Sequence, residues 1–255
     1  MKLTTVIITF NEERNIGRCL QSVKDIADEV VVVDSYSTDR TKEICEKFGV
    51  RFFQQEFHDY ASQKNYAISL AVGDYILSLD ADEQISPKLK EEILKVKEKT
   101  TAQAYSFNRM TNYCLEKWIK HCGWYPDVAL RLVKKELAVF KGEFVHEGIL
   151  LDPNIEVVHL KGDLYHYSYY STEEHIERVN KYSTLGAKKY LTKKKRKISC
   201  CDIVCRTFWT FFRSYFLKLG FLDGWAGYKV CYIMSLETFI KYTKVQEMQR
   251  KHSKR

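Results

Sequence analysis

The first hundred residues alternate short apolar runs with segments whose apolar residues have helical spacing. Four apolar runs are expected to form strands: Leu3 to Phe10, Glu29 to Val33, Val50 to Gln54 and Tyr75 to Leu79. Continuous apolar strands that alternate with helices are typical of a parallel sheet covered on both faces. In such sheets ligands bind at the carboxyl-terminal edge of the strands. The sequence therefore predicts an α/β fold whose functional groups lie where these strands end.

The pattern changes after about residue 100. Ala104 to Tyr113 is expected to form another strand, and the segments VALRLV and FKGEFVHEGI follow as hairpin-like strands. Strands of this kind extend a parallel sheet with antiparallel neighbours, so we expect one mixed sheet flanked by helices. No G-x-G-x-x-G follows the first strand and no G-x-x-x-x-G-K occurs. A dinucleotide site of the Rossmann type and a P-loop are therefore disfavoured.

Three carboxylates follow the fourth predicted strand, in the stretch GDYILSLDADEQISP. Asp80 and Asp82 are separated by one residue, which places both side chains on the same side of an extended backbone, and Glu83 comes next. Paired carboxylates suit a hard cation such as Mg²⁺ or Mn²⁺, which shares its other positions with water or substrate phosphates. The alternative is a capped, solvated turn before the helix that Ser86 and Pro87 begin.

Charge is divided unevenly along the chain. Residues 1–170 contain 22 Lys and Arg against 26 Asp and Glu, whereas residues 171–255 contain 19 against 7. An acidic part followed by a basic part indicates a catalytic or binding domain joined to a segment that meets an anionic partner. We therefore expect one domain over residues 1–170 and a basic, aromatic-rich helical region over residues 171–255.

The basic region favours a phospholipid surface over nucleic acid. Residues 188–197 hold seven Lys or Arg, and from Cys201 to Leu219 a helical projection separates a basic face from an aromatic stripe. A second amphipathic helix is expected from Trp225 to Lys244. Such helices either pack on the catalytic domain or lie in a bilayer interface, and the large stripe favours an anionic membrane surface. No recognisable nucleic-acid module accompanies the charge, so no nucleic-acid partner is predicted.

Cysteine usage and hydropathy bear on the cellular compartment. The eight cysteines show no CxxC pair and no zinc-site spacing, which indicates reduced thiols. No stretch of 18 uncharged apolar residues occurs, so a conventional transmembrane helix is not expected. The first apolar run is too short for a secretory signal. A cytoplasmic protein is therefore predicted.

Several motifs occur together in one order: VIITFNEERNI, VVVDSYSTDRT, the QKN of residues 63–65, SLDADE, GWYPDVALRL and VHE. In this order and spacing, residues 1–170 resemble the family-2 glycosyltransferases, which have the GT-A fold. The stretch from Tyr215 to Gly224 is similar to one in bacterial lipopolysaccharide inner-core glucosyltransferases of this family. The resemblance implies that the basic region is an amphipathic helical appendage to a GT-A domain.

The resemblance also implies an activity. It is the metal-dependent, inverting transfer of a hexose, such as glucose from UDP-glucose, to a sugar of a lipopolysaccharide core or related lipid-linked glycan. The enzyme would be peripheral on the inner face of the bacterial inner membrane. Two alternatives remain: transfer to a polyprenyl phosphate, and a non-catalytic module that binds sugar nucleotides or nucleic acid.

Roles on the donor side follow from the resemblance. Thr9 and Asn11 would border the nucleotide, and Asp34 would accept the N3–H of a uracil. Lys64 would lie near the nucleotide phosphates as a point charge.

The resemblance places the metal beside these residues. Asp80 would lie near the ribose or a metal-bound water, and Asp82 would ligate Mg²⁺ or Mn²⁺. His166 is a candidate to complete the metal shell, with a purely structural histidine as the alternative.

An inverting transfer also needs a base that takes the proton of the acceptor hydroxyl. Glu147 is the first candidate, with His146 to orient it, and Asp127 is the competing base. Arg131 would pair with Asp127 or hold an acceptor phosphate. For the acceptor itself, Trp124 and Tyr125 have aromatic faces that suit a sugar, although packing under a loop explains them equally well.

Overall fold

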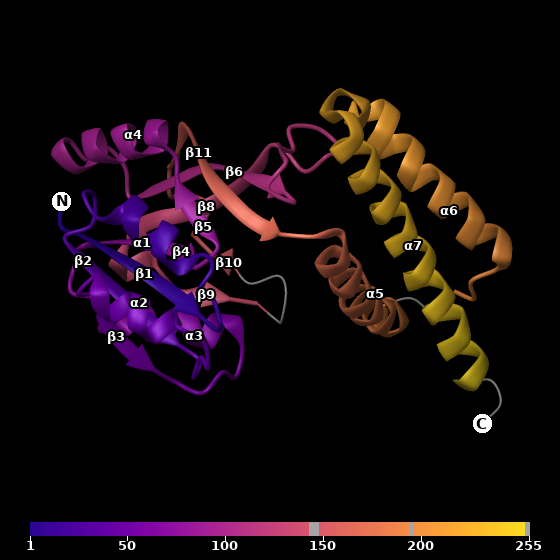
Figure 1. Cartoon of the computed structure of the whole chain (residues 1–255), viewed down its shortest axis with the longest axis horizontal. Coiled ribbons are helices and arrows are strands. Elements are labelled where there is room, and N and C mark those ends of the chain that lie inside the picture. Colours follow the sequence, from indigo (N-terminus) through magenta and orange to yellow (C-terminus); the bar gives the residue numbers. More distant parts are fainter. Residues whose placement is uncertain (143–147, 194–195, 253–255) are drawn as a thin grey trace. The chain divides into compact units, whose positions relative to one another are not determined.

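The computed structural model describes residues 1–142, 148–193 and 196–252 (Figure 1). The chain forms two compact units. The first comprises Met1–Met110 and Asp127–Tyr167, and the second comprises Thr111–Pro126 and Ser168–Arg255. This division differs from a single boundary near residue 170, because residues 111–126 belong to the second unit.

A mixed sheet runs through the first unit. Its strands are β1 (Leu3–Thr9), β2 (Glu29–Asp34), β3 (Arg51–Gln54), β4 (Tyr75–Asp80), β5 (Glu83–Ile85), β6 (Ala104–Tyr113), β8 (Asp127–Lys134) and β11 (Val157–Tyr169). The order is β3-β2-β1-β4-β8-β6-β11-β5, and β7 (Lys117–Trp118) pairs with β6. The first four are parallel, whereas β8 runs antiparallel to β4 and to β6. The predicted mixed α/β sheet is confirmed. The short strands β9 (Phe140–Lys141) and β10 (Gly148–Ile149) form a separate pair.

Helices cover both faces of the parallel strands because alternate side chains of each strand point to opposite faces. On one face Ile7 packs in a cluster with α1 (Ile16–Val23), α2 (Thr41–Lys47) and α4 (Pro87–Glu98). On the other face Val6 packs in a cluster with α3 (Tyr60–Leu70).

A close approach between α4 and β11 fixes the far edge of the sheet. The Ser86 side chain accepts a hydrogen bond from the Leu89 N–H and caps α4, as the sequence predicts. A Cβ atom at Gly162 of β11 would lie 2.3 Å from the Leu89 nitrogen, so only glycine fits there. This contact lets β11 pass the start of α4 and pair with β5, which places His166 opposite Glu83.

The second unit is helical. It contains α5 (Thr172–Lys193), α6 (Cys200–Phe212) and α7 (Gly224–His252), with a π-helical turn over Arg213–Leu217 and a 3-10 turn over Gly220–Asp223 between the last two. Residues 111–126 belong to this unit because Tyr113, Ile119 and Cys122 form a buried cluster with apolar residues of α7. In the described part of the chain, no helix combines the length and apolarity needed to cross a bilayer.

The aromatic stripe predicted on α6 is divided between two environments. Phe211 and Tyr215 pack against the cluster on α7. Val204 and Phe208 are 64% and 66% exposed. One part of the stripe thus holds the helices together, and the other part faces outward.

Candidate functional site

Polar residues predicted to bind the donor meet at the carboxyl-terminal edge of the parallel strands. β1 lies between β2 and β4, with Thr9 paired to Asp34 and Ile8 paired to Asp80. The prediction that Asp34 and Asp80 end on the same edge is therefore confirmed. Thr9 Oγ1 is buried without a hydrogen-bond partner. Because buried hydroxyl groups nearly always have one, Thr9 is a candidate to contact a bound molecule.

Asp34 and Asn11 tie together the loops that follow β1 and β2. Asp34 is fully buried and accepts hydrogen bonds from the Ser37 N–H at 2.8 Å and from Gln54 Nε2 at 3.1 Å. Asn11 has a φ of 53°, in the left-handed region that asparagine tolerates. Its Oδ1 accepts from the Thr38 N–H at 2.8 Å. The two loops thus form one polar rim.

Asp80 lies between two buried cations. Lys64 Nζ is 2.9 Å from Asp80 Oδ1, and Arg131 Nη2 is 2.8 Å from Asp80 Oδ2. Burial disfavours the ionised carboxyl group, but Lys64 and Arg131 outweigh it and hold the pKa of Asp80 well below its usual range. Asp80 is therefore a carboxylate at physiological pH, with both oxygens engaged by the protein.

Glu83 connects this pair of cations to a third. Its buried carboxylate accepts from Arg131 Nη2 at 2.9 Å and lies 3.5 Å from Arg109 Nη1. It also accepts from the backbone N–H of Asp80 at 2.9 Å. Arg109 lies opposite Asp127 in the sheet and approaches its carboxylate at 2.7 Å. The cation that pairs with Asp127 is therefore Arg109, whereas Arg131 pairs with Asp80 and Glu83.

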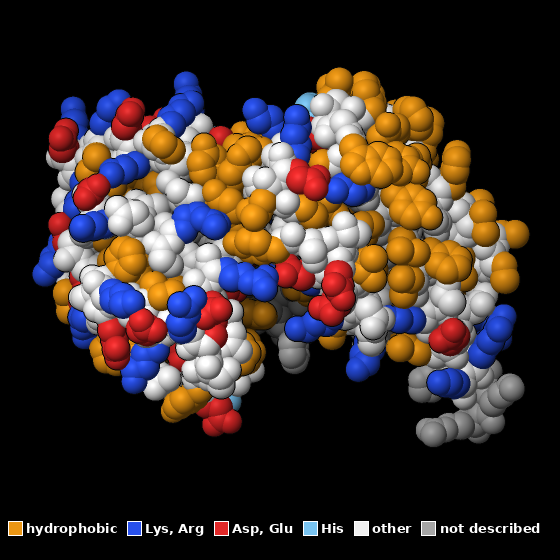
Figure 2. All heavy atoms as spheres, in the orientation of Figure 1, with side chains coloured by type: hydrophobic (Ala, Val, Ile, Leu, Met, Phe, Trp, Pro, Cys, Tyr) orange, Lys and Arg blue, Asp and Glu red, His pale blue; other side chains and the backbone are white. Residues whose placement is uncertain are grey.

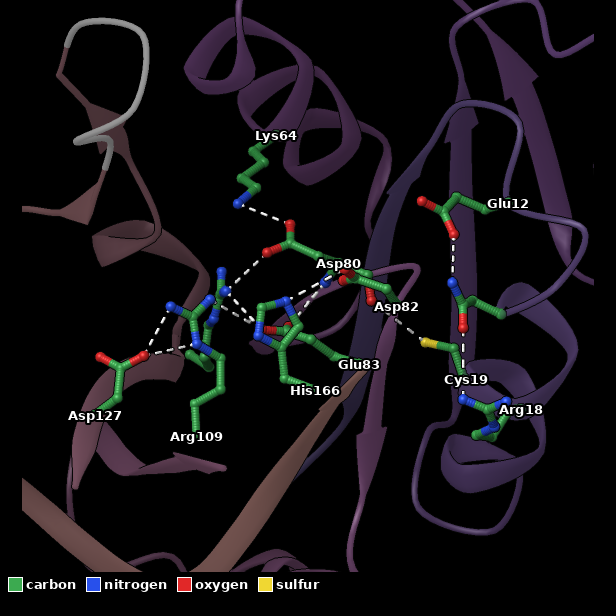
Figure 3. Close-up of polar contacts among 12 residues, drawn as sticks. Glu12, Arg18, Cys19, Lys64, Asp80, Asp82, Glu83, Arg109, Asp127 and His166 are labelled. Atoms are coloured by element: carbon green, nitrogen blue, oxygen red, sulfur yellow. Dashed lines mark hydrogen bonds and ion pairs between the residues drawn. The ribbon is translucent and has the colours of Figure 1, made fainter. Parts of the chain in front are cut away.

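Asp82 faces His166, as Figure 3 shows. His166 Nε2 is 3.2 Å from Asp82 Oδ2, and the two side chains are 15% and 17% exposed. The pairing of β11 with β5 sets this geometry, because the Tyr167 N–H donates to the Asp82 carbonyl at 2.9 Å. The structure thus brings together two predicted metal ligands that lie far apart in the sequence.

The donor atoms fit a hard divalent cation held by few protein ligands. Carboxylates suit Mg²⁺ and Mn²⁺, and imidazole is a common metal ligand. Among residues 1–142, 148–193 and 196–252, no group of three or more His, Cys, Asp and Glu side chains is arranged to hold a metal ion. The oxygens of Asp80 already bind Lys64 and Arg131. A metal on Asp82 and His166 would therefore take its remaining ligands from water and from a diphosphate.

The two aromatic residues predicted to contact the acceptor lie in a different unit from the sheet edge, and two other predicted residues lie outside the described part of the chain. Trp124 and Tyr125 belong to the second unit, where the Trp124 ring stacks on Tyr169 with 5.5 Å between ring centroids. Trp124 is thus part of an aromatic cluster within that unit. Glu147 and His146, the predicted base and its orienting residue, lie outside the described residues.

Glu83 and Arg109, two residues of the charged cluster around Asp80, were not predicted as site residues. Glu83 is visible in the acidic stretch, but its spacing gives it no partner, and Arg109 stands in a strand without any motif. The available signal is a physical one: a charged side chain within a largely apolar strand needs an opposite charge to offset its desolvation. Arg109 in β6 meets this requirement through Glu83 and Asp127.

Comparison with known proteins identifies a family for this chain. The family described as Glycosyl transferase family 2 matches residues 4–144. The chain is 32% identical over 260 residues to an uncharacterized glycosyltransferase of Rickettsia conorii, covering 96% of this chain and 90% of that protein. It is 28% identical over 240 residues to the lipopolysaccharide core biosynthesis glycosyltransferase LpsC of Rhizobium meliloti, covering 88% of this chain and 82% of that protein.

The fold has a counterpart among solved structures. The mannosyltransferase PcManGT from Pyrobaculum calidifontis, in complex with GDP-Man and Mn²⁺, is similar with a TM-score of 0.59 at 15% identity, over 96% of this chain and 86% of that one. The predicted GT-A fold is confirmed. The length of the match to the family and the identity to its relatives lead to one conclusion: the chain belongs to glycosyl transferase family 2.

Proposed function

We propose that this chain transfers a hexose from a nucleoside-diphosphate sugar to a hydroxyl group of a lipid-linked glycan. The observation that carries the proposal is the contact of Asp82 with His166 beside the ionised Asp80, at the edge where parallel strands end. The similarity to LpsC, named for lipopolysaccharide core biosynthesis, supports a core sugar as acceptor. The donor of the similar mannosyltransferase is a nucleoside-diphosphate sugar.

The polar rim of β1 and β2 would hold the nucleoside. Asp34 is positioned by Ser37 and Gln54, and a carboxylate has lone pairs for one further donor, the N3–H of uracil. Asn11 and the unpartnered hydroxyl of Thr9 would border the base and ribose. These contacts favour a uridine nucleotide, and the donor we propose is UDP-glucose.

Asp82 and His166 would hold Mg²⁺ or Mn²⁺. The cation would neutralise charge that develops on the departing diphosphate. Asp80 would reach the metal through water or contact the ribose, because Lys64 and Arg131 occupy its oxygens. Lys64 would add positive charge near the phosphates while it keeps Asp80 in place.

Proton transfer from the acceptor would fall to Glu147, oriented by His146. Asp127 is the weaker candidate, because Arg109 already binds its carboxylate and would have to be displaced. Trp124 and Tyr125 would contact the acceptor sugar. The burial of Arg131 and its pairing with Asp80 and Glu83 favour a positioning role over the predicted contact with an acceptor phosphate.

A lipid-linked acceptor would require the enzyme to work at a membrane surface. We place it as a peripheral protein on the cytoplasmic face of the bacterial inner membrane. The excess of Lys and Arg over residues 171–255 supports an anionic surface as partner.

The proposal is tested by a screen of sugar nucleotides. The full chain is incubated with UDP-glucose, other UDP-hexoses and GDP-mannose, with Mn²⁺ or with EDTA, and then with core oligosaccharides or polyprenyl phosphate. We expect donor hydrolysis that EDTA abolishes and transfer to a core glycan. Activity that is unchanged in EDTA would contradict the metal site. Transfer to polyprenyl phosphate alone would contradict the proposed acceptor.

A further inference from the structure

The hairpin formed by α6 and α7 exposes an unusual amount of apolar surface. Eleven of the large hydrophobic side chains that are exposed among the described residues lie between positions 204 and 239 (Figure 2). They are Val204, Phe208, Trp209, Phe216, Leu217, Leu219, Phe221, Leu222, Trp225, Tyr232 and Phe239. Soluble monomers rarely expose contiguous apolar patches of this kind unless the patch binds a partner or a membrane.

The exposed aromatic rings are continuous rather than scattered. On α6 and the turn after it, Phe212 stacks on Phe208 and Trp209, with centroids 6.1 and 6.0 Å apart, and contacts Phe216 at 5.3 Å. On α7, Trp225, Tyr228 and Tyr232 form a second stack. Residues four apart lie on one side of a helix, so each stack is a stripe along its helix.

The charge beside these stripes is positive. Between Ile203 and Leu236 the chain has four basic residues, Arg206, Arg213, Lys218 and Lys229, and a single acidic one, Asp223. Lys229 pairs with Glu116 at 3.1 Å, so the excess positive charge comes from the other three. Asp223 is 4% exposed and accepts hydrogen bonds from the backbone N–H groups of Lys120 and His121. The surface that the hairpin presents is therefore aromatic and cationic, which complements an anionic lipid surface.

A groove between the two helices is lined by two cations and two threonines. Its volume is about 210 Å³, and it is lined by Arg206, Trp209, Thr210, Thr238, Lys241 and Tyr242. The Arg206 guanidinium lies over the Tyr242 ring, with 4.9 Å from Cζ to the centroid, and its Nε is buried without a hydrogen-bond partner. The hydroxyl oxygens of Thr210 and Thr238 are 3.2 Å apart.

Each groove cation has an acidic residue one turn before it on its own helix. Asp202, one turn before Arg206, caps α6 with Ser199 and pairs with Arg196 at 2.9 Å. Glu237, one turn before Lys241, is half-buried; desolvation raises its pKa, and the nearby Lys241 opposes that shift. Arg206 and Lys241 both line the groove, and a phosphate oxygen accepts charge-assisted hydrogen bonds from such cations.

We infer that the α6–α7 hairpin docks on an anionic membrane, with the aromatic stripes at the acyl boundary and a phospholipid phosphate in the Arg206–Lys241 groove. Trp209 connects the two parts, because it lines the groove and belongs to the stripe on α6. The inference rests on the proposed function in one respect: a lipid-linked acceptor is what makes a membrane the expected partner.

The test measures binding of the full chain to vesicles at about 0.15 M salt, where weak surface attraction is screened. Vesicles of phosphatidylcholine alone are compared with vesicles that contain about 30 mol % phosphatidylglycerol, which supply an anionic phosphate surface. Binding is followed by co-sedimentation and by tryptophan fluorescence, to which the exposed Trp209 and Trp225 contribute. We expect about tenfold or greater preference for the anionic vesicles.

Variants separate the groove from general charge. Arg206→Gln with Lys241→Gln should lower binding to anionic vesicles about 10- to 30-fold. The control, Lys42→Gln with Lys47→Gln, removes the same charge from exposed positions of α2 and should lower it less than about threefold. Phe208→Ser, at a position 66% exposed, should weaken binding to both vesicle types and retain the fold.

Several outcomes would overturn the inference. They are equal loss in the groove variant and the control, absence of vesicle binding by the wild type, self-association through the hairpin, and a preference for RNA over vesicles. Binding of inorganic phosphate that Arg206→Gln with Lys241→Gln abolishes, but that does not compete with vesicles, would show a site for free phosphate instead. The proposed function is tested separately, because Asp82→Asn should lose sugar transfer but bind vesicles like the wild type.

Discussion

The two units of this chain differ in how their charged side chains are paired and exposed. In the first unit Asp80, Glu83, Lys64 and Arg131 are gathered behind the strand edge, and each has a partner of opposite sign within 3 Å. In the second unit the cations between positions 203 and 236 lie among exposed aromatic rings. The acidic residue of the same segment, Asp223, is buried. Charges that are paired and desolvated hold one geometry, which suits chemistry. An excess of cations beside exposed apolar surface suits an extended anionic partner.

The largest expected effect separates the two candidate bases of the first unit. Glu147→Gln should lower the transfer rate about 10²- to 10⁴-fold, because a general base contributes that much, while donor binding stays unchanged. Asp127→Asn should cost less than tenfold, since Arg109 already engages that carboxylate. Initial rates and calorimetric titration with UDP measure the two quantities. If the costs were reversed, Asp127 would be the base.

The next effect tests whether the paired charges stabilise the first unit. Arg131→Met should lower the free energy of unfolding by about 3–5 kcal/mol, because it removes the buried cation that Asp80 and Glu83 share. Lys134→Met, at a partly exposed position of the same strand, should cost about 1 kcal/mol or less. Hydrogen exchange of β1 and β4 during urea titration reports on this unit. Equal costs would show that the buried cluster contributes nothing special.

A pH dependence distinguishes the units. Burial and then Arg178 lower the pKa of His175 to about 4. As pH falls from about 6.5 to 4, His175 becomes protonated in the unfolded chain but stays neutral in the folded second unit. The free energy of unfolding therefore falls by about 1.4 kcal/mol per pH unit. The pKa of Asp80 is depressed, so its contribution persists above about pH 4 and is lost only in stronger acid.

The four tryptophans make the pH prediction measurable. Trp118, Trp124, Trp209 and Trp225 all belong to the second unit, so their fluorescence in urea follows that unit. Between pH 7 and 5 its midpoint should fall, whereas the exchange rates of β1 and β4 should not reflect a loss of stability. His175→Phe should remove the dependence, and His58→Gln should leave it unchanged. A midpoint that stays constant in the wild type would contradict the assignment.

The smallest expected effect, the loss of a helix N-cap, should be the same in both units. Ser86 caps α4 in the first unit and Ser199 caps α6 in the second, each by accepting a backbone N–H. Replacement of either serine by alanine should cost about 1 kcal/mol. Urea unfolding monitored in each unit checks the pair. A much larger cost at one of them would mean that the units differ in local backbone stabilisation as well as in charge.

The first unit was largely predictable because its signals are local. Apolar runs between helices define the parallel strands, and Asp34 and Asp80 follow their strands directly, so chain order gives the edge. The pairing of His166 with Asp82 depends on β11 crossing to β5, which is a nonlocal contact that periodicity does not reveal. Residues 171–255 were predicted to be helical, but the bounds of α5 were not predicted, because its charged residues mask the apolar positions. The split of the stripe on α6 depends on which residues α7 covers.

Other assignments depend on more than pattern. The roles of Asp127 and Arg131 could not be read from their spacing of four, because both stand on a strand and the neighbouring strand supplies Arg109. Residues 111–126 join the second unit through the burial of Ile119 and Cys122 against α7, and no boundary signal in the sequence marks this. Sheet neighbours and helix docking are properties of the whole fold.

The most direct test of the central claim is a calorimetric titration of the wild type and Asp82→Asn with UDP, each in Mn²⁺ and in EDTA. We expect Mn²⁺ to raise the affinity of the wild type for UDP about 10- to 100-fold and to have little effect on that of the variant. The reason is that Asp82 would supply a ligand to the cation that binds the diphosphate. The same affinity for UDP in Mn²⁺ and in EDTA in the wild type would contradict it.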